Sequence, residues 1–566
     1  MTSLTLGDSL PNPEGSAREA RRPSHPVALI IALITAAIVL LPIATIIAVA
    51  LSSGGADWPH LVRYVLPQAS RTTAVLLALV AFGTAFIGIG CAWLVVAYDF
   101  PTRRLLAWAL VLPLAVPPYL AAYAFAEFFD YVGPLQSMIR GIFGFQSRNQ
   151  YWFPEIRSTG GAALVMVSVT FPYVYLTTRV VFLMQGRNIA DVARTLGAAP
   201  ARVFWRVLLP VARPAIAAGI ALVLMETIND IGAVEHLGVR TLTLSVYSTW
   251  LNRGSLEGAA QIALVMLLLV IALLAAERAA RSRQRFHAPR ATQMKSRPPR
   301  IRLSGWRAAA AAFLGVIPIL FGFGIPLLIF GRYALNRLEQ IMDPKLAQAF
   351  FTSLSVALAT AALTVGMALV LLYAVRLSRS RKMAVLVRIA SIGYGLPGTI
   401  LALGLLISLA RFDNFVDALA REYAGFSTGL IFTGSAVAVV LACSIRFLAL
   451  AEGAVHSGLE KLPPHLDEAA RSLGRSAASS TLTVLLPLLK PAILTACILV
   501  FVDTVKELSA TILLRPFGFN TLATFVYENA SRGVVEDGAM AALVIIATSI
   551  APVILLSGAL MRDREA

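Results

Sequence analysis

Two stretches of the sequence each place acidic residues four positions apart inside an otherwise apolar run. The first holds Glu226 and Asp230, and the second holds Asp503 and Glu507, with Lys506 between them. Residues four apart share one face of a helix, so each pair predicts two carboxylates that point the same way. Ionisable groups in apolar helices are costly and face a partner or a water-filled path. We predict that these five residues line a translocation pathway. The alternative is a structural ion-pair network, in which Lys506 neutralises an acid.

Histidines and cysteines give weaker signals. The histidines are scattered without helical metal spacing, and only His236, beside Glu235, is a weak exception to a surface interpretation. The cysteines lie in apolar segments without CxxC spacing, which favours small buried thiols. No His/Glu or Ser/Lys set stands at catalytic spacing, so we expect no catalytic residue, no cofactor in this chain and no stably bound metal. The residues concerned are His25, His60, His236, His287, His456, His465, Cys91, Cys443 and Cys497.

Prolines and tyrosines gather in one apolar run and its later counterpart. The prolines are expected either to kink helices around a cavity or to be tolerated packing kinks. The tyrosines offer phenol oxygen, although aromatic residues in membrane helices usually only pack. The residues are Pro113, Pro117, Pro118 and Pro397, with Tyr119, Tyr123 and Tyr394 near them.

The elements that must position these residues are membrane helices. Of the 566 residues, 58% are hydrophobic and 14% are charged, and the mean hydropathy is +0.76. This composition excludes a soluble enzyme. A spanning helix needs about 20 apolar residues, and about twelve such runs are present. We predict an all-α integral membrane protein. The runs are 26–51, 72–98, 105–126, 160–183, 214–234, 258–276, 306–331, 349–375, 386–410, 427–450, 491–514 and 537–561.

The distribution of basic residues predicts the orientation. With the N-terminus in the cytoplasm, the inside segments hold about 32 Lys and Arg and the outside loops about 14. Both termini are therefore expected in the cytoplasm, and the net charge of +18 reflects topology rather than nucleic acid binding. The predicted organisation is a tail (1–25), a first module (26–276), a basic cytoplasmic linker (277–305), a second module (306–561) and a short tail (562–566).

The two modules are related in sequence. Asp-Val-Ala-Arg-Thr-Leu-Gly at 191–197 matches Glu-Ala-Ala-Arg-Ser-Leu-Gly at 468–474, at an offset of 277. The same offset relates two Leu-Pro pairs, and it pairs Glu226 with Asp503 and Asp230 with Glu507. Later segments match at an offset of 280. Each module has an even number of spans, so we predict two tandem parallel six-helix repeats with the pathway between them.

The repeat is strongest in a cytoplasmic loop before the fifth span of each module. Each loop is predicted to form a short helix, a glycine, a second short helix and a Leu-Pro that opens the next span. The glycine would allow positive φ or a close backbone approach, so each loop is a candidate docking elbow for a dimeric partner. The predicted elbow residues are Asp191, Ala193, Gly197, Leu209 and Pro210, with Glu468, Ala469, Ala470, Gly474, Leu486 and Pro487.

The spacing of Glu468-Ala-Ala, Gly474 and Leu486-Pro487 resembles the EAA loop of ATP-binding-cassette importer permeases. The first copy departs from the pattern, with Asp191-Val192 in place of Glu-Ala. The resemblance implies that a dimer of cassette ATPase subunits grips these loops and that a periplasmic binding protein delivers the cargo. The chain has no GxxxxGK[ST] motif, so the ATPase must be a separate subunit. The resemblance also places the chain in the bacterial inner membrane, with the lipid bilayer as its surroundings.

The segments 225–238 and 505–518 are similar to the fused two-module permeases of ferric-iron importers. Hard trivalent iron prefers carboxylate and phenolate oxygen, which agrees with converging acids. We therefore expect a ferric-iron permease subunit that is not itself an enzyme. The alternatives are the same mechanism with thiamine, a phosphonate or a polyamine as cargo, and a secondary transporter. The absence of charge motifs in the short loop at 99–104 disfavours the secondary transporter.

Overall fold

The computed structural model describes residues 26–52, 57–195, 200–282, 300–378, 386–387, 393, 395–463, 466, 470, 472–474 and 476–562. In this part of the chain the regular elements are helices, apart from one parallel pairing of β1 (Tyr98–Asp99) with β2 (Ile301–Arg302). Eleven of its helices are long and apolar enough to span a membrane, or twelve if a bent pair is counted as one span. The prediction of an all-α membrane protein with about twelve spans is confirmed.

The first half contains a third span that is broken between α4 and α5. Its helices are α1 (Pro26–Ser52), α2 (Trp58–His60), α3 (Leu66–Ala97), α4 (Arg103–Ala109), α5 (Pro118–Phe129), α6 (Pro134–Phe143), α7 (Thr159–Thr195), α8 (Pro200–Val203), α9 (Leu209–Asn229), α10 (Gly232–His236), α11 (Leu242–Leu251) and α12 (Leu256–Ser282). The 3₁₀ turns η2 (Leu112–Ala115) and η3 (Arg148–Gln150) lie among them.

The second half repeats this order. Its helices are α13 (Gly305–Ile319), α14 (Ile325–Asn336), α15 (Pro344–Ser378), α17 (Gly398–Ala424), α18 (Ala436–Glu460), α20 (Ala477–Ser480), α21 (Leu486–Val505), α22 (Thr511–Leu514), α23 (Leu522–Ser531) and α24 (Ala539–Arg562). Its 3₁₀ turns are η6 (Leu338–Met342) and η9 (Val535–Gly538).

Four π-helical turns share one cause. They are η1 (Leu61–Val65), η4 (Phe204–Leu208), η5 (Leu320–Gly324) and η8 (Thr481–Leu485), and the second residue after each is a proline. Proline has no N–H, so it cannot continue the regular ladder of hydrogen bonds. The residue before it bonds five positions back instead, as when Leu209 donates to the Phe204 carbonyl. The two Leu-Pro pairs thus lie inside the helices that form the fifth spans, and these begin earlier than the sequence predicted.

The internal repeat is also visible in the packing, because the two halves form equivalent hydrogen bonds. The backbone N–H of Leu242 donates to Thr73 Oγ1 at 3.0 Å, and that of Leu522 donates to Ser353 Oγ at 2.7 Å. The two donors, Leu242 and Leu522, correspond at the offset of 280, and so do the two acceptors, Thr73 and Ser353. The halves also interlock, because α1 packs against α15 and α17, while α14 packs against α5.

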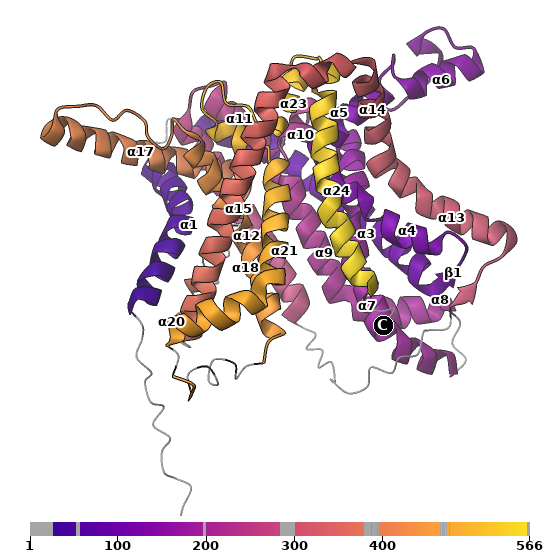
Figure 1. Cartoon of the computed structure of the whole chain (residues 1–566). Helices are drawn as coiled ribbons and strands as arrows, with labels where there is room; N and C mark the ends of the chain where they lie inside the picture. The colour runs from indigo at the N-terminus through magenta and orange to yellow at the C-terminus, as the bar shows by residue number, and fades with distance from the viewer. Residues whose placement is uncertain are drawn as a thin grey trace, which may run out of the picture.

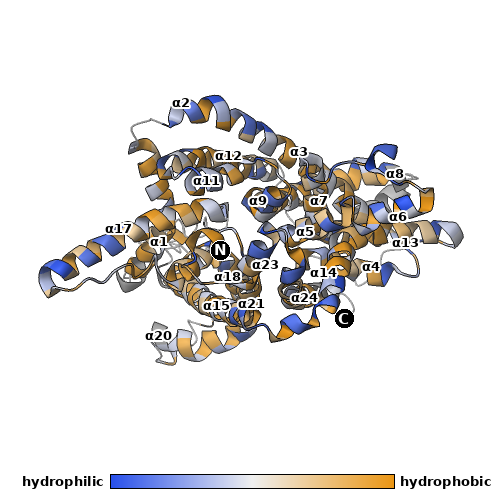
Figure 2. Ribbon diagram, turned by 90° about the horizontal axis from the view of Figure 1, so that it is seen from above, coloured by the Kyte–Doolittle hydropathy of each residue, from blue (hydrophilic) through white to orange (hydrophobic). Residues whose placement is uncertain are grey.

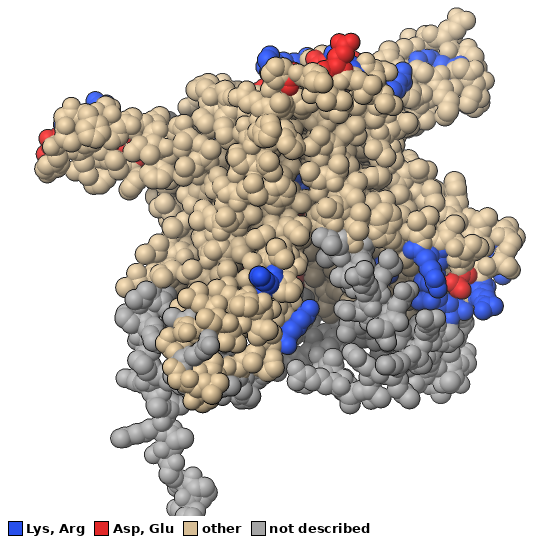
Figure 3. All heavy atoms as spheres, in the orientation of Figure 1, with Lys and Arg blue, Asp and Glu red and all other residues tan. Residues whose placement is uncertain are grey.

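Charged side chains are rare in the middle of the outer surface that Figure 3 shows. On the face in Figure 3, Lys, Arg, Asp and Glu of the described residues lie mostly at the upper and lower edges, with an almost uncharged belt between them. The start of α1, the end of α24 and the short helices α8 and α20 lie at the lower edge (Figure 1). Seen from above, α6 and the far end of α17 leave the bundle on opposite sides (Figure 2). The belt has the character of a lipid-facing surface.

One predicted span begins later than expected, because the run 427–450 corresponds to α18, which starts at Ala436. In the run 386–410, residues 386–387 are helical and α17 starts at Gly398, while residues between them lie partly outside the described part of the chain. Pro397 sets the start of α17, because a residue before proline is disfavoured in a helix and Pro397 itself is extended, with ψ 136°. Pro117 does the same before α5, with ψ 144°.

Candidate translocation site

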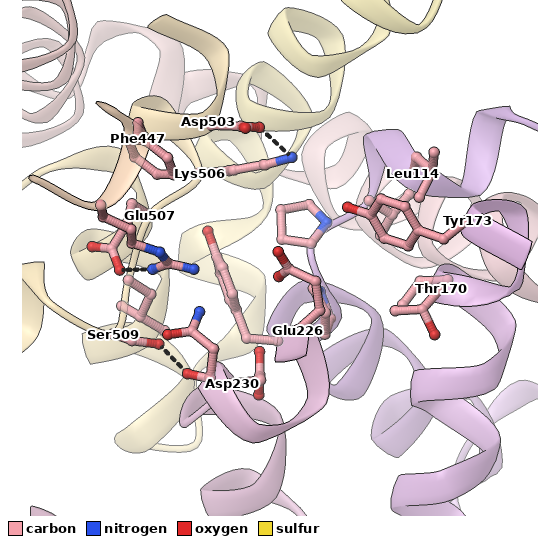
Figure 4. A pocket seen from close by; sticks show the side chains of 18 residues that line it. Leu114, Thr170, Tyr173, Glu226, Asp230, Phe447, Asp503, Lys506, Glu507 and Ser509 are labelled. Atoms are coloured by element: carbon pink, nitrogen blue, oxygen red, sulfur yellow. Dashed lines mark hydrogen bonds and ion pairs between the residues drawn. The ribbon is translucent and has the colours of Figure 1, made fainter. Parts of the chain in front are cut away.

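The predicted pathway residues meet in one cavity. It contains about 740 Å³ of space not filled by atoms, and its lining includes all five of Glu226, Asp230, Asp503, Lys506 and Glu507. Side chains of both halves surround it (Figure 4). The acids that correspond at the sequence offset of 277 therefore line the same cavity. Whether they carry cargo stays a prediction.

The second half supplies its acids together with their counter-charges. Arg446 Nη1 lies 2.7 Å from Glu507 Oε1, and these side chains are 10% and 1% exposed. Lys506 Nζ lies 2.8 Å from Asp503 Oδ1, with the two side chains about a quarter exposed, at 28% and 25%. Figure 4 shows both pairs as dashed contacts at the cavity wall. Each acid of this half is therefore neutralised within its own half.

The acids of the first half are arranged differently. Within the described part of the chain, neither Glu226 nor Asp230 pairs with a Lys or Arg within 4.0 Å. Asp230 is 8% exposed, and its Oδ1 accepts a hydrogen bond from the backbone N–H of Ala233 at 2.7 Å. With every side chain counted as ionised, the cavity carries four negative and two positive charges. The uncompensated negative charge belongs to the first half.

The prediction that each acid pair lies on one face of one helix is wrong. Helix α9 ends at Asn229 and α21 ends at Val505, so Asp230 and Glu507 lie just beyond the helices that hold Glu226 and Asp503. The reason is local capping. Asp230 accepts from the first turn of α10, and Glu507 accepts from the N–H groups of Ala510 and Thr511 at 2.9 and 3.0 Å. These bonds turn the chain out of the span.

The cavity lies where the two halves touch. Asn229 Oδ1 accepts a hydrogen bond from the backbone N–H of Gly398 at 2.6 Å, and its carbonyl accepts one from Ser509 Oγ at 2.7 Å. Both partners belong to the second half. Asn229, the counterpart of Lys506, thus joins the two halves by hydrogen bonds next to the acids. Any movement that opens the cavity between the halves must break or shift these bonds.

The prolines of the third span kink it against the cavity. The segment Arg103–Ala115 meets Pro118–Phe143 at 96°, and Pro117, Pro118 and Tyr119 line the cavity. The Tyr119 side chain is 2% exposed, and its hydroxyl has no hydrogen-bond partner in the described residues. Of the two interpretations of these prolines, the structure supports a kink around a cavity. Tyr394 lies outside the described residues.

Sequence reasoning missed Arg446, which lies inside α18 and lines the cavity. The available signal was a single arginine in the predicted span 427–450, where an unpaired charge would be costly. Its partner could not be found by spacing, because Glu507 is 61 residues away.

The elbow loops are described in part. Gly474 is exposed and has a φ of +82°, so the turn itself requires glycine there. Ala470 is 7% exposed, Leu209 and Pro210 begin α9, and Leu486 and Pro487 begin α21. Asp191 and Ala193 lie in the last turns of α7. Gly197, Glu468 and Ala469 lie outside the described residues. The flanking helices α8 and α20 share the lower face (Figure 1), as two docking elbows require.

Metal-binding groups do not converge in the part of the chain that the structure covers. There, no three His, Cys, Asp or Glu residues are placed to hold a metal ion. Cys91 and Cys443 are buried free thiols, and Cys497 is half-buried. His60 and His456 are exposed, and His236 is half-buried beside a second cavity. His25, His287 and His465 lie outside the described residues.

Comparison with known proteins places the chain among transport permeases. Residues 84–285 match the family described as binding-protein-dependent transport system inner membrane component. An Fe(3+)-transport system permease protein of Haemophilus influenzae is 26% identical over 490 residues, which cover 86% of this chain and 88% of that protein. A molybdenum transport system permease protein of Escherichia coli is 32% identical over 227 residues, covering 38% and 95% of the two chains. A sulfate transport system permease protein of Escherichia coli is 33% identical over 175 residues, covering 30% and 57%.

Proposed function

We propose, from the premise that the chain belongs to the family of binding-protein-dependent transport system inner membrane components, that it forms the membrane pathway of a ferric-iron importer. The chain is a multi-pass permease subunit of an ATP-binding-cassette importer. In the proposal, a periplasmic binding protein delivers the ion, a separate dimeric cassette ATPase supplies the energy, and the chain itself holds no cofactor. Both termini, and the face that carries α8 and α20, are placed in the cytoplasm.

The observation that carries the proposal is the charge of the central cavity. Two carboxylates of the first half, Glu226 and Asp230, face it without a paired cation within 4.0 Å in the described residues. Carboxylate oxygen suits a hard trivalent cation and repels an anion. The relative that matches most of this chain's length is named for Fe(3+) transport, which supports the same cargo.

The paired acids keep the cavity from holding the ion too firmly. A pathway must attract its ion strongly enough to admit it and weakly enough to release it. If all four acids were free, the cavity would carry a larger net negative charge and would attract a trivalent cation more strongly. Because Arg446 and Lys506 occupy the acids of the second half, the ion meets two free carboxylates and two neutralised ones.

Movement is proposed to start at the cytoplasmic elbows and to end at the junction between the halves. The elbows lead directly through η4 and η8 into α9 and α21, the helices that end at the cavity. A displacement of an elbow by the ATPase therefore moves the cavity wall as one rigid helix. The bonds of Asn229 to Gly398 and Ser509 are the contacts that must change when the halves separate.

An oxyanion is the second cargo to consider, because the molybdenum and sulfate permeases are similar to parts of this chain. Arg446 and Lys506 are the cations that such a cargo would use. Both are already within 2.8 Å of a carboxylate, so an anion would have to displace that carboxylate and approach the two free acids as well. The cavity therefore favours a cation.

The test is transport by the reconstituted complex. The chain, its ATPase and its binding protein are placed in proteoliposomes, and uptake is measured for radiolabelled ferric iron, molybdate, sulfate, thiamine and a polyamine. The proposal predicts ATP-dependent ferric uptake and no uptake of the other four. Molybdate or sulfate uptake without ferric uptake would replace the proposed cargo. A complex without the ATPase is the control, and it should transport nothing.

A further inference from the structure

Two segments, one in each half, leave the bundle on the side opposite to α8 and α20 (Figure 1). The first arm comprises residues 129–157, with α6 and η3, and the second arm comprises residues 409–433, with the end of α17. Each extends from a helix whose N-cap is a proline, Pro117 for α5 and Pro397 for α17, and these prolines correspond at the offset of 280. The arms lie on opposite sides of the molecule (Figure 2). Neither arm contributes to the lining of the central cavity.

The polar side chains of α6 face the arm itself. Gln136 is buried, its Nε2 donates to the Phe129 carbonyl at 2.8 Å, and its Oε1 accepts from the Tyr151 hydroxyl at 2.6 Å. Arg140 donates to the Tyr131 carbonyl and lies over the Tyr131 ring, 4.1 Å from its centroid. The polar side of this helix is therefore occupied by contacts within the first arm.

The apolar side chains of α6 point away from the protein. Met138, Ile142 and Phe143 are each more than half exposed, and Trp152 in the following loop is 85% exposed. Met138 and Ile142 are four positions apart and share one face of the helix. This polarity is the reverse of that of a helix on a soluble protein, whose apolar stripe faces the core. The first arm is therefore built for an apolar environment outside it.

The second arm has the same inverted arrangement. Asp413 is fully buried, and it accepts hydrogen bonds from the backbone N–H groups of Phe432 and Thr433 at 3.0 and 2.9 Å. One turn further along, Asp417 accepts from the Ser427 hydroxyl at 2.7 Å. These bonds hold the returning loop against the polar side of α17.

Another side of the end of α17 is apolar and exposed. Phe412, Phe415, Leu419 and Tyr423 recur every three or four residues, which places them on one face of the helix. They are 49%, 61%, 39% and 80% exposed. Exposed apolar patches of this kind mark an interaction surface. Because both arms carry one, the surface belongs to the repeat and not to one irregular loop.

The position of the arms favours the bilayer over a protein partner. A binding protein that delivers cargo must sit over the pathway between the halves, whereas the arms extend away from the bundle on opposite sides (Figure 2). Helix α17 packs against α1, a candidate membrane span, so the second arm continues a surface that already meets lipid. Helices that lie in the membrane interface present Phe, Trp and Leu to the acyl chains, about 5–10 Å into the boundary with the headgroups.

We propose that the two arms are membrane anchors, which lay their exposed apolar faces into the leaflet opposite to the α8 and α20 face. In the proposed orientation this is the outer leaflet. Each arm extends from a helix that starts beside the central cavity, since Pro118 lines the cavity and Gly398 donates to Asn229. An anchored arm holds that helix at a fixed depth while α9 and α21 move. The anchors go beyond the proposed function and hold for any cargo.

The test is the accessibility of spin labels in the complete complex, in nanodiscs of phosphatidylethanolamine and phosphatidylglycerol. Met138→Cys and Phe415→Cys are labelled one at a time, in a chain whose own cysteines are replaced by alanine. Molecular oxygen, which concentrates in lipid, should relax both labels more strongly than a water-soluble nickel chelate. Ser137→Cys and Asn414→Cys are the matched controls, because both residues are exposed neighbours outside the apolar faces, and nickel should dominate there.

The outcome for each arm is decided by its own label. Stronger relaxation by nickel than by oxygen at Met138→Cys or Phe415→Cys would overturn the anchor for that arm. A label that faces water and becomes immobilised only when binding protein is added would assign the arm to that protein and also overturn the anchor. Ile142→Cys and Tyr423→Cys replace a variant that fails to assemble. None of these measurements uses transport, so failure of the anchors is distinguishable from failure of ferric uptake.

Discussion

Asp230 and Glu507 occupy corresponding places in the two halves but have different electrostatic surroundings. Both lie just past a fifth-span helix, both are buried, and both accept a backbone N–H three residues ahead. Glu507 also pairs with Arg446 at 2.7 Å. The residue corresponding to Arg446 at the offset of 277 is Val169, which lines the same cavity. The repeat thus conserves the backbone role of the acid and changes its charge partner.

Glu226 and Asp503 also correspond in the two halves, and here too, among the described residues, only the acid of the second half has a cation as its partner. Glu226 corresponds to Asp503, but Asp503 has Lys506 at 2.8 Å, whereas the counterpart of Lys506 is Asn229, which bonds across the junction. One half therefore keeps its acids neutralised, and the other leaves them open to the cavity. We infer that duplication produced the geometry of the pathway. Later divergence then left the acids of the first half to attract cargo and paired those of the second half for stability.

The largest effect is expected at the buried pair of the second half. Arg446→Met leaves Glu507 charged and buried, and removing one partner of such a pair costs about 3–5 kcal/mol. The complex should lose thermal stability and most of its abundance. Melting of the purified complex tests this, with Val169→Met as the matched control. Arg446→Met/Glu507→Gln should recover part of the loss, and an equally unstable double variant would contradict the pairing argument.

The elbows are where the halves should behave alike. Gly474 has a φ of +82°, where a side chain costs roughly 1–2 kcal/mol, and a Cβ there would meet no other atom within 4 Å. Gly474→Leu and Gly197→Leu should both leave insertion near normal and abolish ATPase association and uptake together. Co-purification of the ATPase and uptake by the same preparations measure this. Normal uptake by both variants would remove the elbows from the coupling step.

Making the first half resemble the second should block cation transport. Val169→Arg places a guanidinium in the cavity near Asp230, and we expect ferric uptake to fall about tenfold, which corresponds to 1.4 kcal/mol. Val169→Gln is the uncharged control of similar size and should transport better than the arginine variant. Equal uptake by the two variants would show that charge in the first half is unimportant.

The smallest effect is expected at the more exposed ion pair of the second half, Lys506 with Asp503. Because Lys506 and Asp503 are about a quarter exposed, Lys506→Met should cost only about 0.2–1 kcal/mol of stability. The structural ion-pair interpretation predicts instead that Lys506→Met is as harmful as Asp503→Asn and that the double change recovers. Melting temperatures of the three variants separate these outcomes.

Much of the architecture was predictable because membrane spans are long and their apolar composition is unambiguous. The pairing of Glu226 with Asp503 also followed from sequence, since the offset of 277 carries both across the repeat. Short-range chemistry was less visible. The ends of α9 and α21 depend on side-chain caps by Asp230 and Glu507, and no hydrophobic pattern reports a cap inside an apolar run.

Contacts between segments far apart in the sequence could not be predicted either. Arg446 meets Glu507 across 61 residues, and Asn229 meets Gly398 across 169. Periodicity within a helix contains no information about either contact. The 96° bend at Pro117 was foreseen as a kink, but its position against the acids needed the packed structure.

Glu226 and Asp230, the open acids of the first half, are proposed to carry the cargo, and one variant tests this role directly. Glu226→Gln/Asp230→Asn keeps the size of both side chains and breaks no ion pair within the described residues, so assembly, melting temperature and basal ATPase should be close to wild type. Radiolabelled ferric uptake should fall at least about tenfold, since the cavity loses its uncompensated negative charge. Wild-type ferric uptake by this variant, in a complex of unchanged stability, would contradict the account.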